Sequence, residues 1–459
     1  MKKLLTASCF AALFFASSAT AADLAQEAQA LRAKALADPT AWEVLESLTT
    51  EVGARSVGTP AIVRAKDWGL AKLTALGFEN VHAEPFTSRA WVRGAESAEV
   101  VSPFPQKLSI LGLGWSSSTP PGGLEAEVVL FKSLQELQAQ PVGALKGKIA
   151  VISQAMRRTQ GPDGYGSGVA PRSIGAAEAA KRGAVGFLVR SISTDDTRLP
   201  HTGSMRGEPG IPAAALSVPD AELLEHMMAR GKPVKVRLNL SSTVIPQAQS
   251  WNVVGELKGA VRPEEVIVVG GHLDSWDPGT GAIDDASGIA IATSAARLAG
   301  TEGGRPARTL RVVMWGSEEQ GGSGAAYALA HKDEAAKIVL AGESDLGGDE
   351  IWRARLPKGS LAQPAMKAFA TVLPDLKVIL SREPADEGGA DVEGLKEAGV
   401  PVVDFDQDAS RYFDLHHSAD DTLDKVDPKK LAQNVAVWAA FLRVTANSDI
   451  DFRKSAVAP

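Results

Sequence analysis

The chain has 459 residues, of which 44% are hydrophobic and 22% charged, which is typical of a globular protein with room for two or three domains. Acidic residues outnumber basic ones and the formal net charge is -7, which argues against nucleic acid or an anionic membrane surface as a partner. The single cysteine is Cys9, so the core must stabilise the fold without disulfides.

The first residues are typical of a secretory signal peptide. Lys2 and Lys3 precede an apolar run over residues 4–16, and small residues follow up to Ala21. We expect cleavage after Ala21, with Ala22 as the alternative, and therefore an exported protein that is periplasmic or extracellular. No later stretch is long and apolar enough to span a membrane.

Residues 22–101 begin a domain that mixes helices and strands. Thr40 is in position to cap a helix over residues 41–52, with Glu43 at the capping-box position. Thr59 and Pro60 favour the start of a second helix, which Gly77 would end. A strand is expected over residues 81–86.

Residues 102–245 differ in composition, because Pro and Gly are frequent and the strand-like runs are short. The expected strands cover residues 126–131, 148–153, 185–190 and 234–240, and the expected helices cover 176–182 and 219–230. We interpret this segment as a compact, β-rich insert. Its central histidine, His201, has no ligand partners at suitable spacing and is better explained by a hydrogen-bonded or solvated loop role.

From residue 246 the alternation of strands and helices resumes. The expected strands cover residues 251–257, 266–269, 309–315, 338–341 and 400–405, and the expected helices cover 286–298, 324–330, 364–373, 391–398 and 429–445. Strands separated by helices predict an α/β fold with a mixed, mostly parallel sheet covered by helices. Residues 22–101 and 246–459 would form this domain, interrupted by the insert at 102–245.

A polar loop follows the buried strand at 266–269 and carries His272, Asp274 and Asp284. Open α/β sheets place their functional sites at the carboxyl ends of such strands. His272 and Asp284 are nitrogen and oxygen ligands suited to a zinc-like metal, and Asp274 could hold the other ring nitrogen of His272. Taken alone, the loop is explained equally well as a polar turn with capping aspartates.

Three further strand ends carry the same kinds of side chain. These are Glu318 and Glu319 after strand 309–315, Asp345 after strand 338–341, and His416 and His417 after strand 400–405. Adjacent carboxylates beyond a buried strand are costly unless a dication neutralises one and the other acts on a water molecule. The set fits two zinc ions that share one aspartate and hold a hydroxide between them, with one glutamate left to move the proton.

Several motifs in this order resemble the di-zinc aminopeptidase and glutamate carboxypeptidase family, and most of all its plasma glutamate carboxypeptidase (carboxypeptidase Q) branch. They are Trp-Val-Arg-Gly at 91–94, Gly-Gly-His-Leu-Asp-Ser-Trp-Asp at 270–277, Glu-Glu-Gln-Gly-Gly at 318–322, Glu-Ser-Asp at 343–345, and His-His-Ser at 416–418 leading to Asp421 and Thr422. The insert resembles a protease-associated domain through residues 145–152 and 182–186. The resemblance covers nearly the whole chain after the leader.

The resemblance implies a zinc-exopeptidase fold and a role for each candidate residue. Asp284 would bridge two zinc ions, with His272 and Asp345 completing one site and Glu319 and His417 the other. Glu318 would be the general base and acid, and Asp274 would support His272. The peptide between Asp284 and Asp285 is usually cis in the family. At the position of His416 the wider family often carries Tyr as a donor to the tetrahedral intermediate, so His416 becomes a candidate oxyanion donor.

We therefore expect an exported di-zinc metallo-exopeptidase that hydrolyses dipeptides or short peptides with a free amino terminus. The residues do not separate an aminopeptidase, a carboxypeptidase and a strict dipeptidase. An acidic loop at residues 386–391 could hold the substrate ammonium group or simply be solvated. We also expect the insert to cover the cleft, and the resemblance makes a homodimer an alternative to a single chain.

Two other functions stay open at this point. One is a receptor-like binding protein that keeps the fold without catalysis, and the other is a single-zinc acyltransferase on the same fold. The complete set of five ligands and a base argues against both.

Overall fold

The computed structural model describes residues 20–455. The predicted signal peptide therefore lies almost entirely outside the described residues, and the predicted cleavage point after Ala21 falls at the first residue of helix α1 (Ala21–Ala35). Within residues 20–455, no helix has the length and apolar character needed to cross a membrane.

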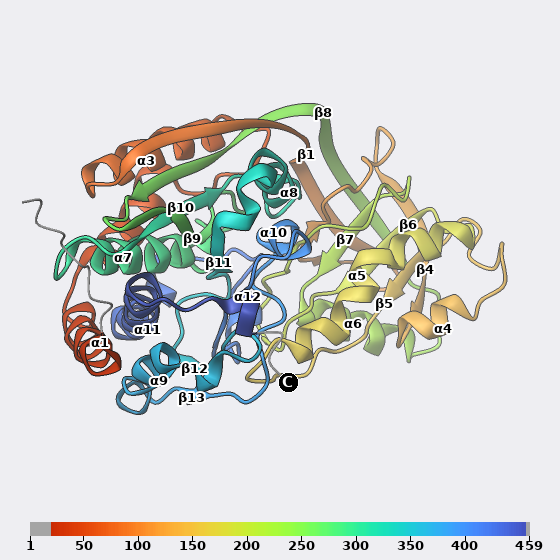
Figure 1. The fold of residues 1–459 in the computed structure, drawn as a ribbon. Helices are drawn as coiled ribbons and strands as arrows, with labels where there is room; N and C mark the ends of the chain where they lie inside the picture. Colours follow the sequence, from red (N-terminus) through yellow and green to blue (C-terminus); the bar gives the residue numbers. More distant parts are fainter. Residues whose placement is uncertain (1–19, 456–459) are drawn as a thin grey trace, which may run out of the picture.

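One long mixed sheet runs through the molecule, in the strand order β11-β9-β10-β8-β4-β5-β6-β7-β3 (Figure 1). Its strands are β3 (Ile110–Gly112), β4 (Leu124–Phe131), β5 (Ile149–Ile152), β6 (Gly186–Arg190), β7 (Ala213–Leu216), β8 (Lys235–Leu257), β9 (Arg262–His272), β10 (Arg308–Trp315) and β11 (Ile338–Glu343). Strand β9 is parallel to β10 and β11, and β4 to β7 are parallel to one another. The prediction of a mixed sheet covered by helices is confirmed.

Two long strands connect the two halves of the sheet. Strand β1 (Glu79–Ser102) pairs with β8 in antiparallel fashion along most of its length, and it also pairs with the short β2 (Gln106–Leu108). The sequence predicted only residues 81–86 of β1 and divided β8 into two strands, because the polar residues at 241–243 look like a loop. Strand β8 passes through residue 245, so the two predicted domains share one strand.

The part of the sheet that carries the predicted site is buried on both faces. Alternate residues of β9 point to opposite sides: Ile267 and Val269 join one hydrophobic cluster, and Val266 and Val268 join another. The first cluster packs under helices α1, α2 (Thr40–Ser47), α3 (Pro60–Ala75), α7 (Ser287–Thr301), α9 (Pro364–Ala370) and α11 (Pro428–Asn447). The second packs under α8 (Ser323–Ala330) and α10 (Glu393–Glu397) (Figure 1).

The segment predicted as an insert has the same layered construction. Ile149 and Val151 face a cluster that includes α6 (Val218–Met228), whereas Ala150 and Ile152 face α4 (Leu134–Gln138) and α5 (Asp163–Lys181). The helix predicted at residues 176–182 is only the last part of α5. Its first half contains glycines at positions 164, 166 and 168, which lower helix propensity and hide the helix in the sequence.

Two local predictions are wrong. Thr40 does not cap its helix: it is the first helical residue, its amide donates to Asp38 Oδ1 at 2.9 Å, and the helix continues as a π-helical turn over Leu48–Val52. The strand predicted at 400–405 is β14 (Asp404–Gln407), which belongs to a separate sheet with β12 (Ile351–Arg355) and β13 (Ile379–Leu380). Val402 makes only an isolated bridge with Ala341 of β11, because the chain turns away to join the second sheet.

The close approach of α7 to the end of β11 requires a glycine at residue 288. A Cβ at this position would overlap the carbonyl oxygen of Ser344. We expect Gly288→Ala to lower the free energy of unfolding by about 2 kcal/mol or more, because a packed backbone has no room to yield. Chemical denaturation measures this. Gly166→Ala is the control, since its Cβ would meet nothing within 4 Å, and it should be neutral or slightly stabilising. Equal effects of the two substitutions would contradict the packing.

Candidate active site

Strands β9, β10 and β11 end at the same edge of the sheet, because they are parallel neighbours. His272 is the last residue of β9, Glu318 and Glu319 follow β10, and Asp345 follows β11. Asp284 lies in the turn that leads into α7, and its peptide bond to Asp285 is cis, as the family resemblance implied. The structure therefore brings together the residues that the sequence assigned to different strand ends.

The first predicted ligand group consists of His272, Asp284 and Asp345. Nε2 of His272 lies 2.9 Å from Asp284 Oδ1 and 3.6 Å from Asp345 Oδ1. One ligand atom from each of the three residues lies within 4.8 Å of the others, which is the arrangement of a metal site.

The second group shares Asp284 with the first. Nε2 of His417 lies 3.1 Å from the other carboxylate oxygen of Asp284, Oδ2, and 3.1 Å from Glu319 Oε2. These three ligand atoms also lie within 4.8 Å of one another. Each oxygen of Asp284 thus faces a different histidine, as expected for a carboxylate that bridges two metal ions.

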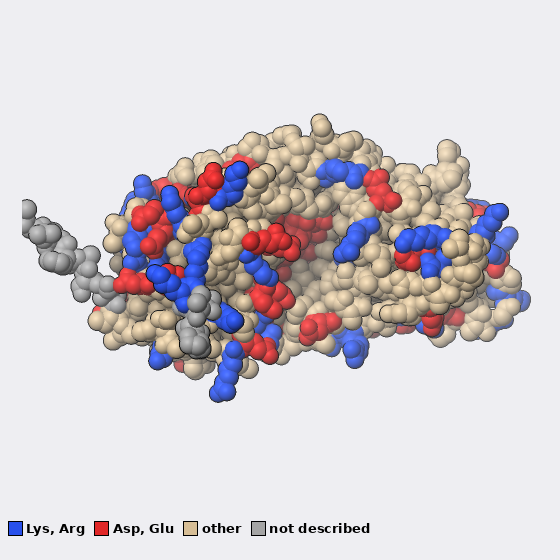
Figure 2. Space-filling view, turned by 45° about the vertical axis from the view of Figure 1, so that its right-hand side comes forward, with Lys and Arg blue, Asp and Glu red and all other residues tan. Residues whose placement is uncertain are grey.

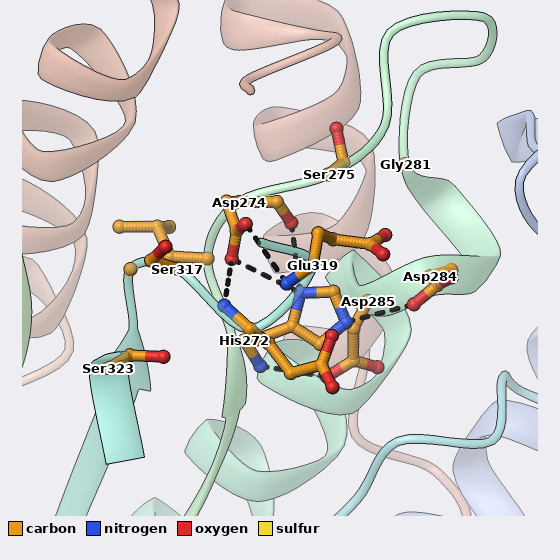
Figure 3. Close-up of polar contacts among 12 residues, drawn as sticks. His272, Asp274, Ser275, Gly281, Asp284, Asp285, Ser317, Glu319 and Ser323 are labelled. Atoms are coloured by element: carbon orange, nitrogen blue, oxygen red, sulfur yellow. Dashed lines mark hydrogen bonds and ion pairs between the residues drawn. The ribbon is translucent and has the colours of Figure 1, made fainter. Parts of the chain in front are cut away.

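The donor set fits zinc, which takes imidazole nitrogen and carboxylate oxygen ligands. Two carboxylate oxygens of the set, Asp345 Oδ1 and Glu319 Oε1, are buried without a hydrogen-bond partner in the described part of the chain. A buried oxygen in this state is costly unless a cation or water satisfies it. Figure 3 shows His272 and Asp284, from the end of β9 and the segment that follows it, close to Glu319, which follows β10.

The charges in this cluster influence one another strongly. Burial acts to raise the pKa of Asp284, but hydrogen bonds from His272 and His417 outweigh it and hold that pKa well below its ordinary value. Burial raises the pKa of Asp345 and of Glu319, and the Asp284 charge adds to both effects. Asp284 is therefore the carboxylate of the set that the surrounding histidines favour most strongly as an anion.

Asp274 is close to His272, but its carboxylate has a different partner from the one predicted. Nδ1 of His272 is hydrogen-bonded to the backbone carbonyl of Asp274 at 3.0 Å, and the Asp274 carboxylate lies 3.6 Å away. The carboxylate accepts hydrogen bonds from the backbone amides of Glu318 at 2.9 Å and Glu319 at 3.3 Å. One residue thus orients His272 through its backbone and both glutamates through its side chain.

Glu318 lies beside the two ligand groups and lines the same cleft. Burial raises its pKa well above the ordinary value; among its neighbours, Asp345 and Glu319 raise it further, while His272 opposes them. A buried carboxyl beside the ligand groups suits a residue that accepts a proton and returns it.

His416 is buried within a group of rings formed by Tyr165, Tyr412, Phe413 and His417. Neither ring nitrogen has a hydrogen-bond partner among residues 20–455. Burial lowers its pKa well below the ordinary value, and the charge on His417 lowers it further. A neutral imidazole carries one N–H, so His416 offers the cleft an unpaired donor.

Several buried residues outside the ligand set hold residues 272–288, the segment that carries His272 and Asp284, in place. Asp285 accepts hydrogen bonds from the amides of His272 at 3.0 Å and Gly288 at 2.9 Å, and Asp421 accepts from the amide of Ile283 at 2.5 Å. Arg55 is completely buried and donates to the carbonyls of Leu273, Thr280 and Gly281. Sequence reasoning missed Arg55, because no pattern in its own segment connects it to a loop more than 200 residues away.

A cleft of about 390 Å³ opens above these residues, between the two halves of the chain. It is lined by Pro162, Tyr165, Val169, Arg172, Ser204, Asp284, Glu318, Glu319, Asp345, Leu346, Tyr412, Phe413, His416 and His417. In Figure 2 the surface is hollowed at its centre, with acidic side chains within the hollow. Five of the lining residues come from the predicted insert, which therefore forms one wall of the cleft.

Arg172 of α5 is a basic residue in this cleft that sequence reasoning missed. Its guanidinium lies over the Tyr165 ring, with 5.5 Å from Cζ to the ring centre, and donates to the Tyr165 hydroxyl at 2.5 Å. It makes no ion pair with a carboxylate in residues 20–455, and its Nε is buried without a partner. The acidic loop at 386–391 does not line the cleft: Asp391 is buried against Ser323, and Asp386 pairs with Arg355.

The chain is similar to several known peptidases. Residues 252–442 match the sequence profile of Peptidase family M28. Mouse carboxypeptidase Q is 39% identical over 412 residues, which cover 89% of this chain and 86% of the relative. A peptidase M28 precursor from Shewanella amazonensis SB2B has a similar structure, with a TM-score of 0.91 and 43% identity over 94% of this chain and 98% of the other. BSAP, a zinc aminopeptidase from Bacillus subtilis, shares the fold at 18% identity, with a TM-score of 0.62 over 88% of this chain and 93% of the other.

The fold and the family therefore define a peptidase, and its two ligand groups could each hold a metal ion. The chain belongs to Peptidase family M28, and its similarity to carboxypeptidase Q extends over most of its length. Family membership favours the peptidase over the receptor and acyltransferase alternatives.

Proposed function

We propose that this chain is an exported di-zinc exopeptidase that cleaves dipeptides or short peptides with a free amino terminus. The observation that carries the proposal is the pair of ligand groups that share Asp284 beside Glu318, at the base of a confined cleft. Export rests on the signal peptide predicted at residues 1–21.

Asp284 would bridge the two zinc ions, with His272 and Asp345 completing one site and Glu319 and His417 the other. Bound zinc would polarise the scissile carbonyl and lower the pKa of a bound water molecule, so that hydroxide is available at neutral pH. The protein holds these ligands ready through Asp274, Asp285 and the ends of three strands, so little reorganisation is needed when substrate arrives.

Glu318 would take the proton from the attacking water and deliver it to the nitrogen of the leaving amine. Its place beside both ligand groups supports this role, because a nearby cation would favour the carboxylate form that accepts the proton. Asp274 accepts a hydrogen bond from the Glu318 amide and so fixes the position of the Glu318 backbone.

Glu318→Gln should bind zinc as the unmodified chain does and lose about 10²–10⁴-fold in kcat, because the amide keeps the shape but cannot carry the proton. Dipeptide hydrolysis and zinc content by mass spectrometry measure the two effects. Glu397→Gln, at an exposed position on α10, should leave both unchanged. Full activity of Glu318→Gln would contradict the proton-transfer role.

His416 would donate its N–H to the oxygen of the tetrahedral intermediate. The proposal is supported by its place in the cleft and by two ring nitrogens that no protein group satisfies. A neutral donor suits this task, since it strengthens its hydrogen bond only as charge develops on the substrate oxygen.

His416→Ala should lower kcat by about 10²–10³-fold while KM changes little, because the lost hydrogen bond forms mainly in the transition state. Steady-state kinetics on a dipeptide measure the two constants, and zinc content shows whether the neighbouring His417 still binds metal. Unchanged kcat in a zinc-loaded variant would exclude His416 as an oxyanion donor.

Arg172 would bind the free carboxylate of the substrate. A guanidinium without a carboxylate partner, inside a cleft otherwise rich in acidic groups, is suited to bidentate recognition of a carboxylate. The name of the relative, carboxypeptidase Q, agrees with a substrate that ends near the metals. A dipeptide presents its amino terminus and its carboxylate on either side of one bond, so one site would serve both.

Arg172→Met should raise KM for a dipeptide by about 10–100-fold and leave KM for the same dipeptide with an amidated carboxyl terminus nearly unchanged, because only the free acid loses an ion pair. Steady-state kinetics on the two substrates measure the difference. Arg230→Met, at an exposed position of the insert, is the matched control. Equal increases in KM for the acid and for the amide would show that Arg172 does not bind the substrate carboxylate.

A further inference from the structure

The segment that carries His417 lacks the support of a regular strand. It follows a short 3-10 turn at Tyr412–Asp414 and places His417 at φ 58°, a backbone conformation that residues other than glycine rarely adopt. His272, in contrast, ends β9 and is fixed by the sheet and by Asp285. The two histidines of the metal centre are thus held by different means.

The predicted insert supplies the support that the His417 segment lacks. Nδ1 of His201 lies 2.8 Å from the carbonyl oxygen of His416, and the amide of Thr202 donates to the carbonyl of His417 at 2.9 Å. The carbonyl of Thr202 also lies 3.3 Å from Nδ1 of His417, so it can orient the ring whose Nε2 faces Asp284. Residues of the insert, on the opposite wall of the cleft, therefore restrain both the backbone and the ring of His417.

His201 is itself rigidly placed. It is 3% exposed, and its amide donates at 2.9 Å to Ser191 Oγ, which follows directly on strand β6. A carbonyl oxygen can only accept, so Nδ1 of His201 must carry the hydrogen. Burial lowers the pKa of His201 to about 4, so the ring is neutral at neutral pH, and the hydrogen bond to the His416 carbonyl selects the tautomer.

A second set of contacts ties the same two segments together. Asp414 Oδ1 accepts hydrogen bonds from Ser193 Oγ at 3.0 Å, from the amide of Thr194 at 2.7 Å and from Thr194 Oγ1 at 2.9 Å. Asp414 lies three residues before His417. The loop at residues 191–204 therefore holds the His417 segment at both of its ends.

We propose that the insert is a part of the metal centre: His201 and Thr202 are positioning residues that hold His417 in the conformation in which it binds zinc. This inference rests on the proposed two-zinc function. It predicts an asymmetry, because the site at His417 depends on the insert and the site at His272 does not.

The test is zinc binding to the metal-stripped full chain, followed by competition with a chelator. His201→Ala should lower the affinity for one of the two zinc ions by about 10–100-fold and change the affinity for the other by less than about twofold. This is the effect expected when a residue that supports a ligand is lost. His201→Asn should recover most of the affinity, since its amide can donate to the same carbonyl. His226→Ala, at an exposed position of the insert, should match the unmodified chain.

The weakened site is assigned with His417→Ala, which should lack that zinc ion altogether. Should His201→Ala not fold, Thr194→Ala removes one of the contacts to Asp414 and should show the same selective loss to a smaller degree. Wild-type affinities in His201→Ala, equal weakening of both sites, or no recovery in His201→Asn would each overturn the inference. An unmodified chain that binds fewer than two zinc ions would contradict the proposed function itself, and the inference with it.

Discussion

Asp284 places one carboxylate oxygen 2.9 Å from His272 and the other 3.1 Å from His417. Around this single side chain lie Glu319, Asp345 and Glu318, so that several carboxylates occupy a small and mostly buried volume. Like charges at such distances repel, and burial increases the cost. Bound cations would neutralise these charges and so stabilise the arrangement.

The support comes from the backbone as much as from side chains. Three buried residues form hydrogen bonds with backbone amides and carbonyls of the segment that carries His272 and Asp284. They are Arg55, Asp285 and Asp421. The carbonyl of Ser344 approaches the backbone of Gly288 so closely that no Cβ fits between them. A loop fixed in this way can present His272 and Asp284 with little conformational freedom, which favours both metal affinity and preorganised catalysis.

The sequence predicted that these side chains would lie together, because most of them follow buried strands in a recognisable order. His272, Glu318, Glu319 and Asp345 each stand just beyond an apolar run, and parallel neighbours bring such positions together. His417 was found by its motif, although the strand expected before it is displaced into a second sheet.

Arg55 and Arg172 could not be predicted in this way. Each acts through contacts that only the tertiary structure creates: Arg55 on carbonyls beyond residue 270, and Arg172 on a cleft formed mainly by residues beyond 280. The long strands β1 and β8 were also missed in part, because half-exposed polar residues such as those at 241–243 obscure the alternation of a strand. These two strands connect the insert to the part of the sheet that carries the two ligand groups.

The central claim is that Asp284 joins two zinc ions. Anomalous X-ray diffraction at the zinc edge, on crystals of the zinc-loaded chain, tests it most directly. The account predicts two zinc ions, one contacted by His272 and Asp345, the other by Glu319 and His417, and both by Asp284. A single zinc ion, or two ions that do not share Asp284, would contradict it.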